Sequence, residues 1–417
     1  MVSVVERAVQ QDLPKNGRSM SDVDPAILCV SHLGWTNVWQ RPQQLLSRLA
    51  RHVPVHFVAE PEIVPACQRE PQLTPVAEMG QLRAWQPTFP NRPEVIAQWR
   101  TVYARVIVDL LVREGWASYR GDVLVPLRAL VVWFYTPTPW YLLDLLPFPT
   151  VVYDVMDELA SFTGAAPDLP WREEQLLDRC DLVFAGGRSL YSARQDRHSN
   201  IHCFPSGVDP AHFATAFAPE TIVPPEIVSL PRPVLGYYGV IDERIDFDLL
   251  AGLARQNPSW SIVMVGPVAK MNPASLPQAA NLHYLGQQPY ARLPAFLKGF
   301  DVCLMPFARN EATQSISPTK ALEYLAAGNP VVSTPVPDVV ASWAEVVRIA
   351  EDAAAFGQAI EQVLAEPEDQ RVRRVARQQR VVEQNDWETI TAEMASLLAA
   401  ALERKSRDWS PSDVPTG

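Results

Sequence analysis

Short apolar segments alternate with longer amphipathic segments along most of the chain. Runs that are hydrophobic at consecutive positions are typical of parallel strands covered by helices on both faces. The runs form two groups, the first at residues 26–31, 54–60, 129–135, 150–156, 181–187 and 201–207, and the second at 233–239, 260–266, 281–286, 301–307 and 330–334. This repeated alternation predicts an α/β protein with two doubly wound, Rossmann-like parallel sheets.

The two groups of runs also predict where the domains begin and end. The first group ends in the Gly-containing turn of FPSGVDPAHF (204–213), and an irregular stretch over 218–233 precedes the second group. The predicted parts are a disordered tail at 1–24, an N-terminal domain at 25–207, a C-terminal domain at 208–385, a helix at 386–405 that returns to the first domain, and a disordered tail at 406–417.

Seven prolines between Pro61 and Pro93 interrupt the pattern of the first domain. We expect this segment to leave the sheet and lie over one edge of the domain. Loops at the carboxyl ends of parallel strands form binding sites, so we expect a ligand between the two domains.

Composition narrows the classes of function. The 417 residues are 47% hydrophobic and 20% charged, and their net charge of −11 argues against a nucleic-acid-binding surface. A local basic patch is still possible at RVRRVARQQR (371–380). Five scattered cysteines suggest reduced thiols in a cytoplasmic protein, and no Cys or His spacing suits zinc. No apolar run is long enough for a membrane span.

Two loops of the first domain carry candidate chemistry. In SHLGWTNVWQRP, Gly34 lets the backbone approach a ligand. Arg41 either holds an anionic group or fixes this loop to its own domain. His32 is either a packed loop residue or a catalyst. The loop lacks GxGxxG, which argues against NAD. In YDVMDELASFTG, Asp154, Asp157 and Glu158 cluster at a strand end, where they can accept hydrogen bonds from sugar hydroxyls or act as a base, or one of them caps a helix. Asp157, at the expected turn, is the functional candidate.

Two loops of the second domain carry the remaining candidates. Gly239 ends its first strand, and Arg244 follows in a loop where it reaches a diphosphate or pairs with a neighbouring acid. The nearby DFD resembles a DxD metal motif, but its expected place in a helix argues against a metal site. Arg309 precedes a predicted helix that starts at Ser317 and Pro318.

Lys320 and Glu323 lie one helical turn apart in that predicted helix. One interpretation is a surface ion pair, which would contribute roughly 0.2–0.5 kcal/mol. The other is a nucleotide site, with Lys320 on a diphosphate and Glu323 on the ribose hydroxyls. The two-domain pattern favours the nucleotide site, with Arg309 and the helix start at Ser317 facing the same cleft.

Three segments resemble a known family. FPSGVDPAHF, DVCLMPF and SPTKALEYLAAGNPVVSTPVPDV are similar to motifs of GT-B glycosyltransferases of the large retaining group called family 4. SHLGWTNVWQRPQQLLSRLA, VVYDVMDEL and GVIDERIDFDLL resemble a bacterial subgroup linked to surface-polysaccharide assembly. The likeness covers roughly residues 26–398.

The resemblance implies a cytoplasmic, metal-independent glycosyltransferase without a cofactor. Its donor would be a nucleoside-diphosphate sugar that is UDP- or GDP-linked. Its acceptor would be a glycan, a lipid-linked glycan or a small molecule. The enzyme would make transient contact with the inner face of the plasma membrane. Arg244 and Lys320 would bind the diphosphate of the donor, and Glu323 would bind its ribose. The segment 283–293, which includes Tyr284, would line the base. Retention by front-face attack is the implied mechanism.

Some positions depart from the family pattern. Ser315 stands where the family often has a glutamate, Ser206 where it has asparagine, and a histidine near Met156 is absent. Two alternatives therefore remain open: a GT-B nucleotide-sugar epimerase, and a non-catalytic nucleotide-sugar-binding protein.

Overall fold

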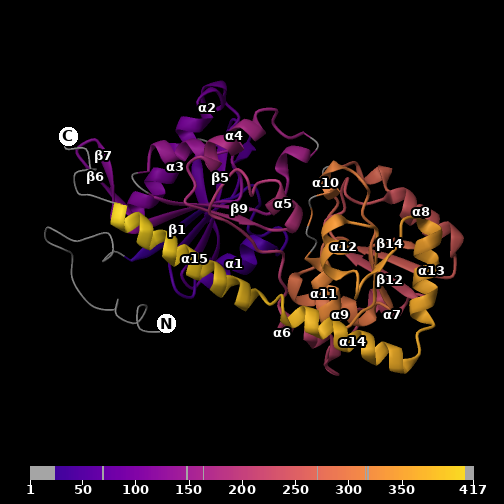
Figure 1. Cartoon of the computed structure of the whole chain (residues 1–417). Helices are drawn as coiled ribbons and strands as arrows, with labels where there is room; N and C mark the ends of the chain where they lie inside the picture. The colour runs from indigo at the N-terminus through magenta and orange to yellow at the C-terminus, as the bar shows by residue number, and fades with distance from the viewer. Residues whose placement is uncertain are drawn as a thin grey trace.

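A computed structural model of the chain describes residues 24–67, 70–146, 149–162, 164–269, 271–314, 316 and 319–408. The predicted tails fall almost wholly outside these residues, as do Ser315 and Ser317. In the described part, two sheets with flanking helices lie next to each other, one in each half of the chain (Figure 1). The predicted α/β class with two parallel sheets is confirmed.

The N-terminal sheet contains the predicted runs and some strands that were not predicted. Its strands are β1 (Pro25–Val30), β2 (Val55–Val58), β3 (Glu62–Val64), β4 (Gln72–Met79), β5 (Leu82–Pro90), β8 (Ala129–Phe134), β9 (Thr150–Val155), β10 (Leu182–Ala185) and β11 (Ile201–Cys203). Their order is β11-β10-β9-β8-β1-β2-β5-β3, with β4 paired to β5. A separate hairpin joins β6 (Ala117–Arg120) to β7 (Val123–Pro126).

The proline-rich segment does not leave the sheet, so the predicted excursion is wrong. Strand β5 pairs in parallel with β2, and β4 then pairs with β5 in the antiparallel sense. Pro75 lies at an irregularity of the β4–β5 register, and Pro87 and Pro90 lie toward the end of β5. Proline is tolerated at bulges and edges of a sheet, where its missing N–H breaks no ladder. The segment therefore extends the sheet.

Helices bury both faces of the N-terminal sheet. On β1, Ile27 and Cys29 pack in a core with α1, whereas Leu28 and Val30 pack in a second core with α3. Alternate side chains of one strand thus face opposite layers, as expected for a doubly covered sheet. The helices of this half are α1 (Arg41–Leu49), α2 (Pro93–Ala97), α3 (Trp99–Arg113), η2 (Trp140–Asp144), η3 (Leu159–Ser161), α4 (Leu169–Leu177) and α5 (Arg188–Ser192).

The C-terminal sheet is parallel throughout its described strands. They are β12 (Val234–Tyr238), β13 (Ser261–Val265), β14 (Leu282–Tyr284), β15 (Val302–Met305), β16 (Val331–Ser333) and the unpredicted edge strand β17 (Arg348–Ile349), in the order β14-β13-β12-β15-β16-β17. The short segments before β12 are α6 (Pro210–Ala214), η4 (Thr215–Phe217) and α7 (Pro225–Val228). The other helices are α8 (Phe247–Gln256), η5 (Pro273–Ser275), η6 (Tyr290–Arg292), α9 (Leu293–Gly299), α10 (Glu311–Gln314), α11 (Lys320–Ala326), α12 (Pro337–Trp343), α13 (Ala353–Leu364) and α14 (Glu368–Glu383).

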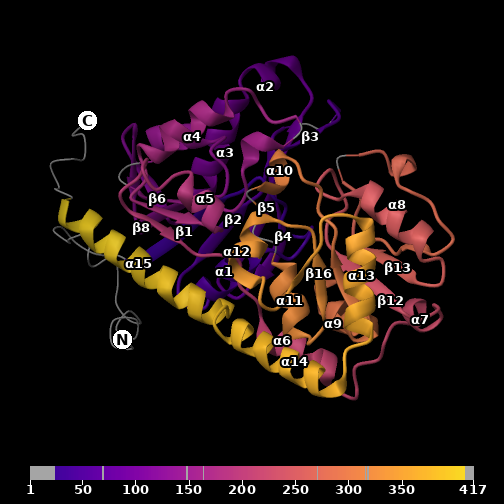
Figure 2. The same ribbon diagram turned by 45° about the vertical axis from the view of Figure 1, so that its right-hand side comes forward.

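The chain crosses between the two halves twice, and the two crossings are bonded to each other. The Val208 N–H donates to the Asn385 carbonyl at 2.8 Å, and the Trp387 N–H donates to the Val208 carbonyl at 2.9 Å. After the second crossing, α15 (Trp387–Asp408) runs along the N-terminal half (Figure 2), and it extends three residues past the expected end at 405. Its Trp387 and Met394 lie in the N-terminal core.

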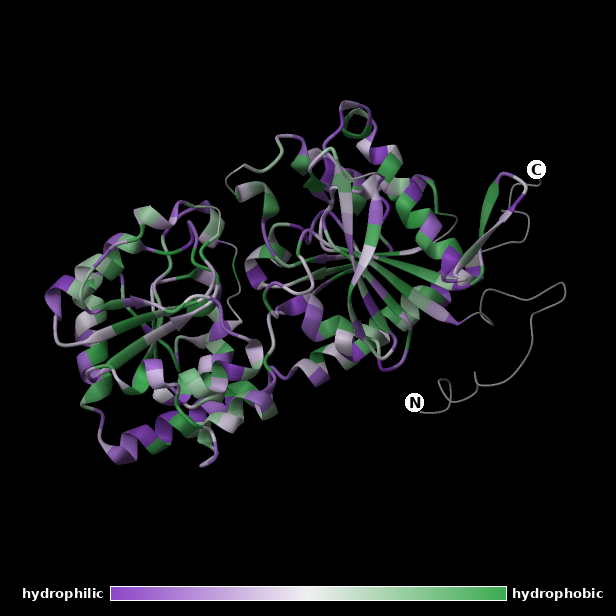
Figure 3. Ribbon diagram, turned by 180° about the vertical axis from the view of Figure 1, so that it is seen from behind, coloured by the Kyte–Doolittle hydropathy of each residue, from purple (hydrophilic) through white to green (hydrophobic). Residues whose placement is uncertain are grey.

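Hydropathy follows this architecture. The sheet strands are mostly hydrophobic, whereas α14, at the lower left of Figure 3, is strongly hydrophilic. None of the helices in the described residues combines the length and the apolar character that crossing a lipid bilayer requires.

A buried ion pair ties four parts of the N-terminal half together. Arg41, at the start of α1, bonds Asp154 of β9 at 2.9 Å, and its Nη1 donates to the Phe204 carbonyl at 2.8 Å. Its guanidinium also lies 6.0 Å from the ring centroid of Trp387. Arg41 and Asp154 are 2% and 0% exposed. Burial raises the pKa of Asp154, and Arg41 opposes that shift. The predicted alternative in which Arg41 fixes its own domain therefore fits this geometry.

We expect Arg41→Met to lower the free energy of unfolding by about 3–5 kcal/mol, because Asp154 would keep a buried charge without its partner. The measurement is urea unfolding of the full chain. Arg51→Met is the matched control, since Arg51 lies just after the same helix and pairs with Glu388 at 2.9 Å, but both side chains are more than half exposed. An exposed pair contributes about 0–1 kcal/mol. Equal losses in the two variants would contradict the role given to Arg41.

Candidate functional site

The ends of several strands meet at a small cavity between the two halves. The cavity has a volume of about 80 Å³, and its lining comes from both sides: Gln40, Arg41, Met156, Asp157, Gly186 and Ser206 from the N-terminal half, and Arg244, Phe307, Ile316, Thr319 and Lys320 from the C-terminal half. A larger cavity lies elsewhere in the C-terminal half. We place the site in the smaller one, because the loops after β1, β9, β12 and β15 converge there.

Lys320 is the first residue of α11 and is half-buried at this cavity. Its Nζ lies 5.4 Å and 5.7 Å from the ring centroids of Phe307 and Tyr237. Burial lowers the pKa of Lys320, and the nearby Arg244 lowers it further. Gly239 makes room for the lysine: its φ is +142°, and a Cβ there would lie 2.7 Å from the Lys320 Cε. A positive φ of this kind favours glycine.

Arg244 pairs with Asp242 and also lines the cavity. Its Nη2 lies 2.8 Å from an oxygen of Asp242, which is 3% exposed. Burial alone would lower the pKa of Arg244, but the hydrogen bond to Asp242 and the charge of Asp157 raise it. The predicted pairing of Arg244 with a neighbouring acid is therefore present, and the guanidinium remains at the cleft.

The N-terminal candidates divide into those that reach the cavity and those that do not. Asp157 lines it and acts electrostatically on Arg244 and Lys320. Glu158 instead pairs with Arg194 at 2.8 Å within its own domain. The His32 ring nitrogen Nδ1 lies 3.0 Å from the Tyr135 carbonyl, which fits a packed loop histidine.

Glu323 lies behind the cavity and is 6% exposed. It accepts a hydrogen bond from the Tyr238 hydroxyl at 2.6 Å. Burial raises the pKa of Glu323, while Tyr238 and Lys320 oppose the shift. Because Glu323 is buried and bonded to Tyr238, it does not form the exposed surface pair with Lys320 that was one of the two interpretations. The structure also leaves Glu323 outside the cavity lining.

The place of Arg309 differs from the prediction. The predicted helix start at Ser317 and Pro318 lies outside the described residues, and within them α11 runs from Lys320, with Thr319 before it. Arg309 is 67% exposed and faces Glu351 at 3.5 Å rather than the cavity. Its neighbours explain this, because Ala308 N–H bonds the Arg244 carbonyl and Asn310 bonds the Glu243 carbonyl, so residue 309 turns outward.

The loop of Gly34 and the segment 283–293 meet across the two halves. Gln287 donates to the Asn37 carbonyl, and the Tyr290 ring stacks on Trp39 with centroids 5.8 Å apart. A Cβ on Gly34 would lie 2.8 Å from the Asn37 side chain, so glycine suits this tight loop. Tyr284 is half-buried, and its hydroxyl donates to the Pro277 carbonyl within the C-terminal half.

Sequence reasoning missed Asp338, which joins the halves on α12. Its carboxylate accepts hydrogen bonds from the backbone N–H groups of Arg188 and Ser189 and from the Ser189 hydroxyl at 2.6 Å. Asp338 is 3% exposed. Its position after the strand PVVST was visible in the sequence, but nothing there indicated a partner 150 residues away.

The DFD segment and the acidic residues give no metal cluster. Asp246 accepts from the Leu249 N–H and caps α8, and Asp248 lies in the first turn of that helix. Among the described residues, there is no group of three or more His, Cys, Asp or Glu side chains placed to hold a metal ion.

Comparisons with known proteins show which proteins the chain resembles. Residues 232–366, which hold the C-terminal sheet, match the family model described as Glycosyl transferases group 1. A Bacillus subtilis protein named as a teichuronic acid biosynthesis glycosyltransferase, TuaH, is 26% identical over 237 residues. That match covers 52% of this chain and spans 59% of the relative's length.

Several solved structures share the fold. Sucrose-phosphate synthase of Thermosynechococcus elongatus matches with a TM-score of 0.68 and 15% identity, over 91% of this chain and 100% of its own. A UDP-forming α,α-trehalose-phosphate synthase of Burkholderia xenovorans matches with a TM-score of 0.64 and 12% identity, over 89% of this chain and 100% of its own. Residues 232–366 therefore resemble the glycosyl transferases group 1 family, and the chain shares the GT-B fold.

Proposed function

We propose that the chain transfers a sugar from a nucleoside-diphosphate sugar, UDP- or GDP-linked, to a glycan, lipid-linked or small-molecule acceptor, with retention of configuration. Support comes from the family match and from a relative whose name gives it a glycosyltransferase role in polysaccharide biosynthesis. A structure among the fold relatives, of an Escherichia coli trehalose-6-phosphate protein, is titled as bound with UDP-2-fluoro glucose.

The observation that carries the proposal is the meeting of two cations at the interdomain cavity. Lys320 and Arg244 come from different loops, and Arg244 lowers the pKa of Lys320. An anionic diphosphate between them would reverse this repulsion and form charge-assisted hydrogen bonds. The leaving diphosphate gains charge as the glycosidic bond breaks, so both cations stabilise the transition state more than the ground state.

Asp157 is the proposed partner for the sugars. It lies across the cavity from the two cations and can accept a hydrogen bond from a sugar hydroxyl. The described residues of the cavity place no second carboxylate beside Asp157. Front-face attack, with the departing phosphate taking the acceptor proton, therefore fits this site better than a covalent intermediate.

Donor binding requires the two halves to separate. The cavity of about 80 Å³ is well below the roughly 300–1,000 Å³ of typical ligand pockets. The contacts that must loosen include the Gln44 side chain on the Tyr290 hydroxyl, at 3.0 Å, and Asp338 on Ser189. The Val208 crossing then acts as the hinge. When the two halves separate, the Glu323 carboxylate would release the Tyr238 hydroxyl and accept hydrogen bonds from the ribose hydroxyls instead.

The acceptor and compartment complete the proposal. We place the enzyme in the cytoplasm, where it reaches a lipid-linked acceptor by peripheral contact with the inner membrane face. No cofactor is needed, because the donor itself supplies the leaving group.

Replacing the two charged residues of α11 should affect catalysis in different ways. Lys320→Ala should mainly lower kcat, since charge on the diphosphate grows in the transition state. Glu323→Gln should mainly raise the donor KM, because ribose contacts do not change during the reaction. Each effect should amount to about 1.5–3 kcal/mol, as for a charge-assisted hydrogen bond. Sugar transfer from the donor selected by a thermal-shift screen provides both constants.

The control for these variants is Arg255→Ala, which removes an exposed cation at the end of α8. Its kinetics should match those of the unaltered chain, and melting temperatures of all three variants exclude misfolding. Unchanged kcat and KM in both Lys320→Ala and Glu323→Gln would refute the donor site.

Chelation tests the metal-free mechanism. Positive charge from Lys320 and Arg244 replaces a divalent cation in this proposal, so activity should stay within about twofold after EDTA treatment. The rate of sugar transfer is measured before and after chelation. Loss of activity that magnesium or manganese restores would show that the diphosphate needs a metal.

A further inference from the structure

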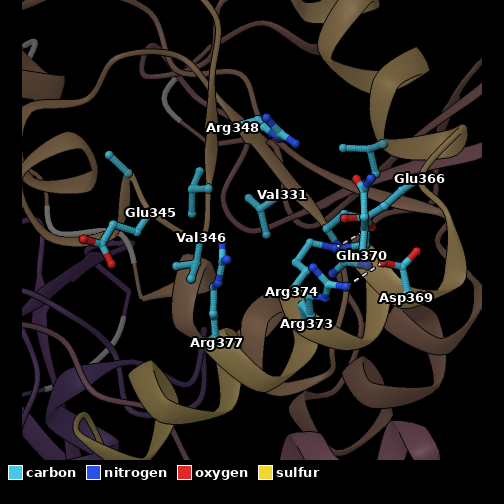
Figure 4. A pocket seen from close by; sticks show the side chains of 14 residues that line it. Val331, Glu345, Val346, Arg348, Glu366, Asp369, Gln370, Arg373, Arg374 and Arg377 are labelled. Atoms are coloured by element: carbon cyan, nitrogen blue, oxygen red, sulfur yellow. Dashed lines mark hydrogen bonds and ion pairs between the residues drawn. The ribbon is translucent and has the colours of Figure 1, made fainter.

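A second cavity lies at the outer edge of the C-terminal half, away from the interdomain cleft. Its volume of about 390 Å³ falls in the range of roughly 300–1,000 Å³ that is typical of small-molecule sites. The edge strand β17, the segment before it and α14 enclose it (Figure 4), and its lining comprises Pro330, Val331, Ala344, Glu345, Val346, Val347, Arg348, Val363, Glu366, Asp369, Gln370, Arg373, Arg374 and Arg377.

Arginines dominate the polar lining. Arg373, Arg374 and Arg377 are one turn apart or adjacent on α14, so helical spacing directs them to one side, and Arg348 comes from β17. This is the basic segment 371–380 that stands out in the sequence of an otherwise acidic chain.

Two of the four arginines already have protein partners. Arg374 bonds Glu366 at 2.9 Å and the Gly328 carbonyl at 3.1 Å, and Arg373 pairs with Asp369 at 2.9 Å. The guanidinium groups of Arg348 and Arg377 make no ion pair or hydrogen bond with another described residue.

The cavity therefore holds two uncompensated cations. Glu366 and Asp369 are used by Arg374 and Arg373. The remaining acid, Glu345, points its carboxylate away from the α14 arginines in Figure 4. Arg348, Arg373 and Arg377 are exposed to solvent, and with the half-buried Arg374 they border a hollow of ligand size beside a sheet edge.

We propose that this cavity is a binding site for a phosphate or diphosphate group, held by Arg348 and Arg377 with Arg374 as a fixed neighbour. Guanidinium groups match phosphate oxygens through paired hydrogen bonds, and a doubly charged anion balances the two free cations. The group can belong to a soluble phosphate ester or to a lipid headgroup. The site is separate from the cleft, and the inference does not depend on the proposed glycosyl transfer.

The test measures pyrophosphate binding to the full chain by calorimetry, with every protein carrying Lys320→Ala so that the cleft contributes least. Adding Arg348→Ala and Arg377→Ala together should weaken binding roughly 100-fold or more, because two charge-assisted contacts are lost. The matched control adds Arg371→Ala and Arg380→Ala, which remove the same charge from exposed positions of α14 outside the cavity. Its affinity should change by less than about threefold.

Vesicles distinguish the two sources of the phosphate. Phosphatidylglycerol vesicles, compared with neutral phosphatidylcholine vesicles, are tested in a sedimentation assay with the same proteins. If the proteins bind the anionic vesicles and only the Arg348/Arg377 variant loses this binding, the ligand is a lipid headgroup. If the proteins bind pyrophosphate but not the vesicles, the ligand is a soluble phosphate ester. The site is refuted if neither probe binds, or if the control variant loses binding equally.

Discussion

The buried pair of Arg41 and Asp154 is the interaction that holds the N-terminal half and its returning helix together. It joins the start of α1 to the end of β9, and the same guanidinium bonds the Phe204 carbonyl in the chain that leads to the other half. Trp387, at the start of α15, packs beside it. Because leaving a buried charge unpaired is costly, this pair favours keeping the four segments together. Asp157, which lines the cleft, follows Asp154 by three residues.

Two cations lie close together on the C-terminal side of the cleft. Gly239 leaves space beside Lys320, and Asp242 holds Arg244. Arg244 lowers the pKa of Lys320, whereas Glu323, Asp242 and Asp157 act in the opposite direction. The aromatic rings of Phe307 and Tyr237 give the lysine partial compensation.

Helix α14 connects the cleft with the outer cavity. Gln378 donates to the Asn329 carbonyl and Arg374 to the Gly328 carbonyl, where α11 ends. One side of the hydrophilic α14 thus secures the helix that carries Lys320 and Glu323, while Arg377 faces the outer cavity. Polar side chains of α14 act here beside its buried Val382, since backbone carbonyls at a helix end need hydrogen-bond donors.

The sequence by itself determined the two parallel sheets, because consecutive apolar runs between amphipathic segments satisfy hydrogen bonding and burial only as covered strands. It also indicated Lys320, Arg244 and Asp157, since strand ends of such sheets form binding loops. Tertiary structure alone decided which groups are partners. Glu323 bonds Tyr238, Arg309 faces Glu351 on the surface, and the proline-rich strands add to the edge of the sheet. Those outcomes depend on contacts between residues distant in the chain, and local patterns do not encode such distances.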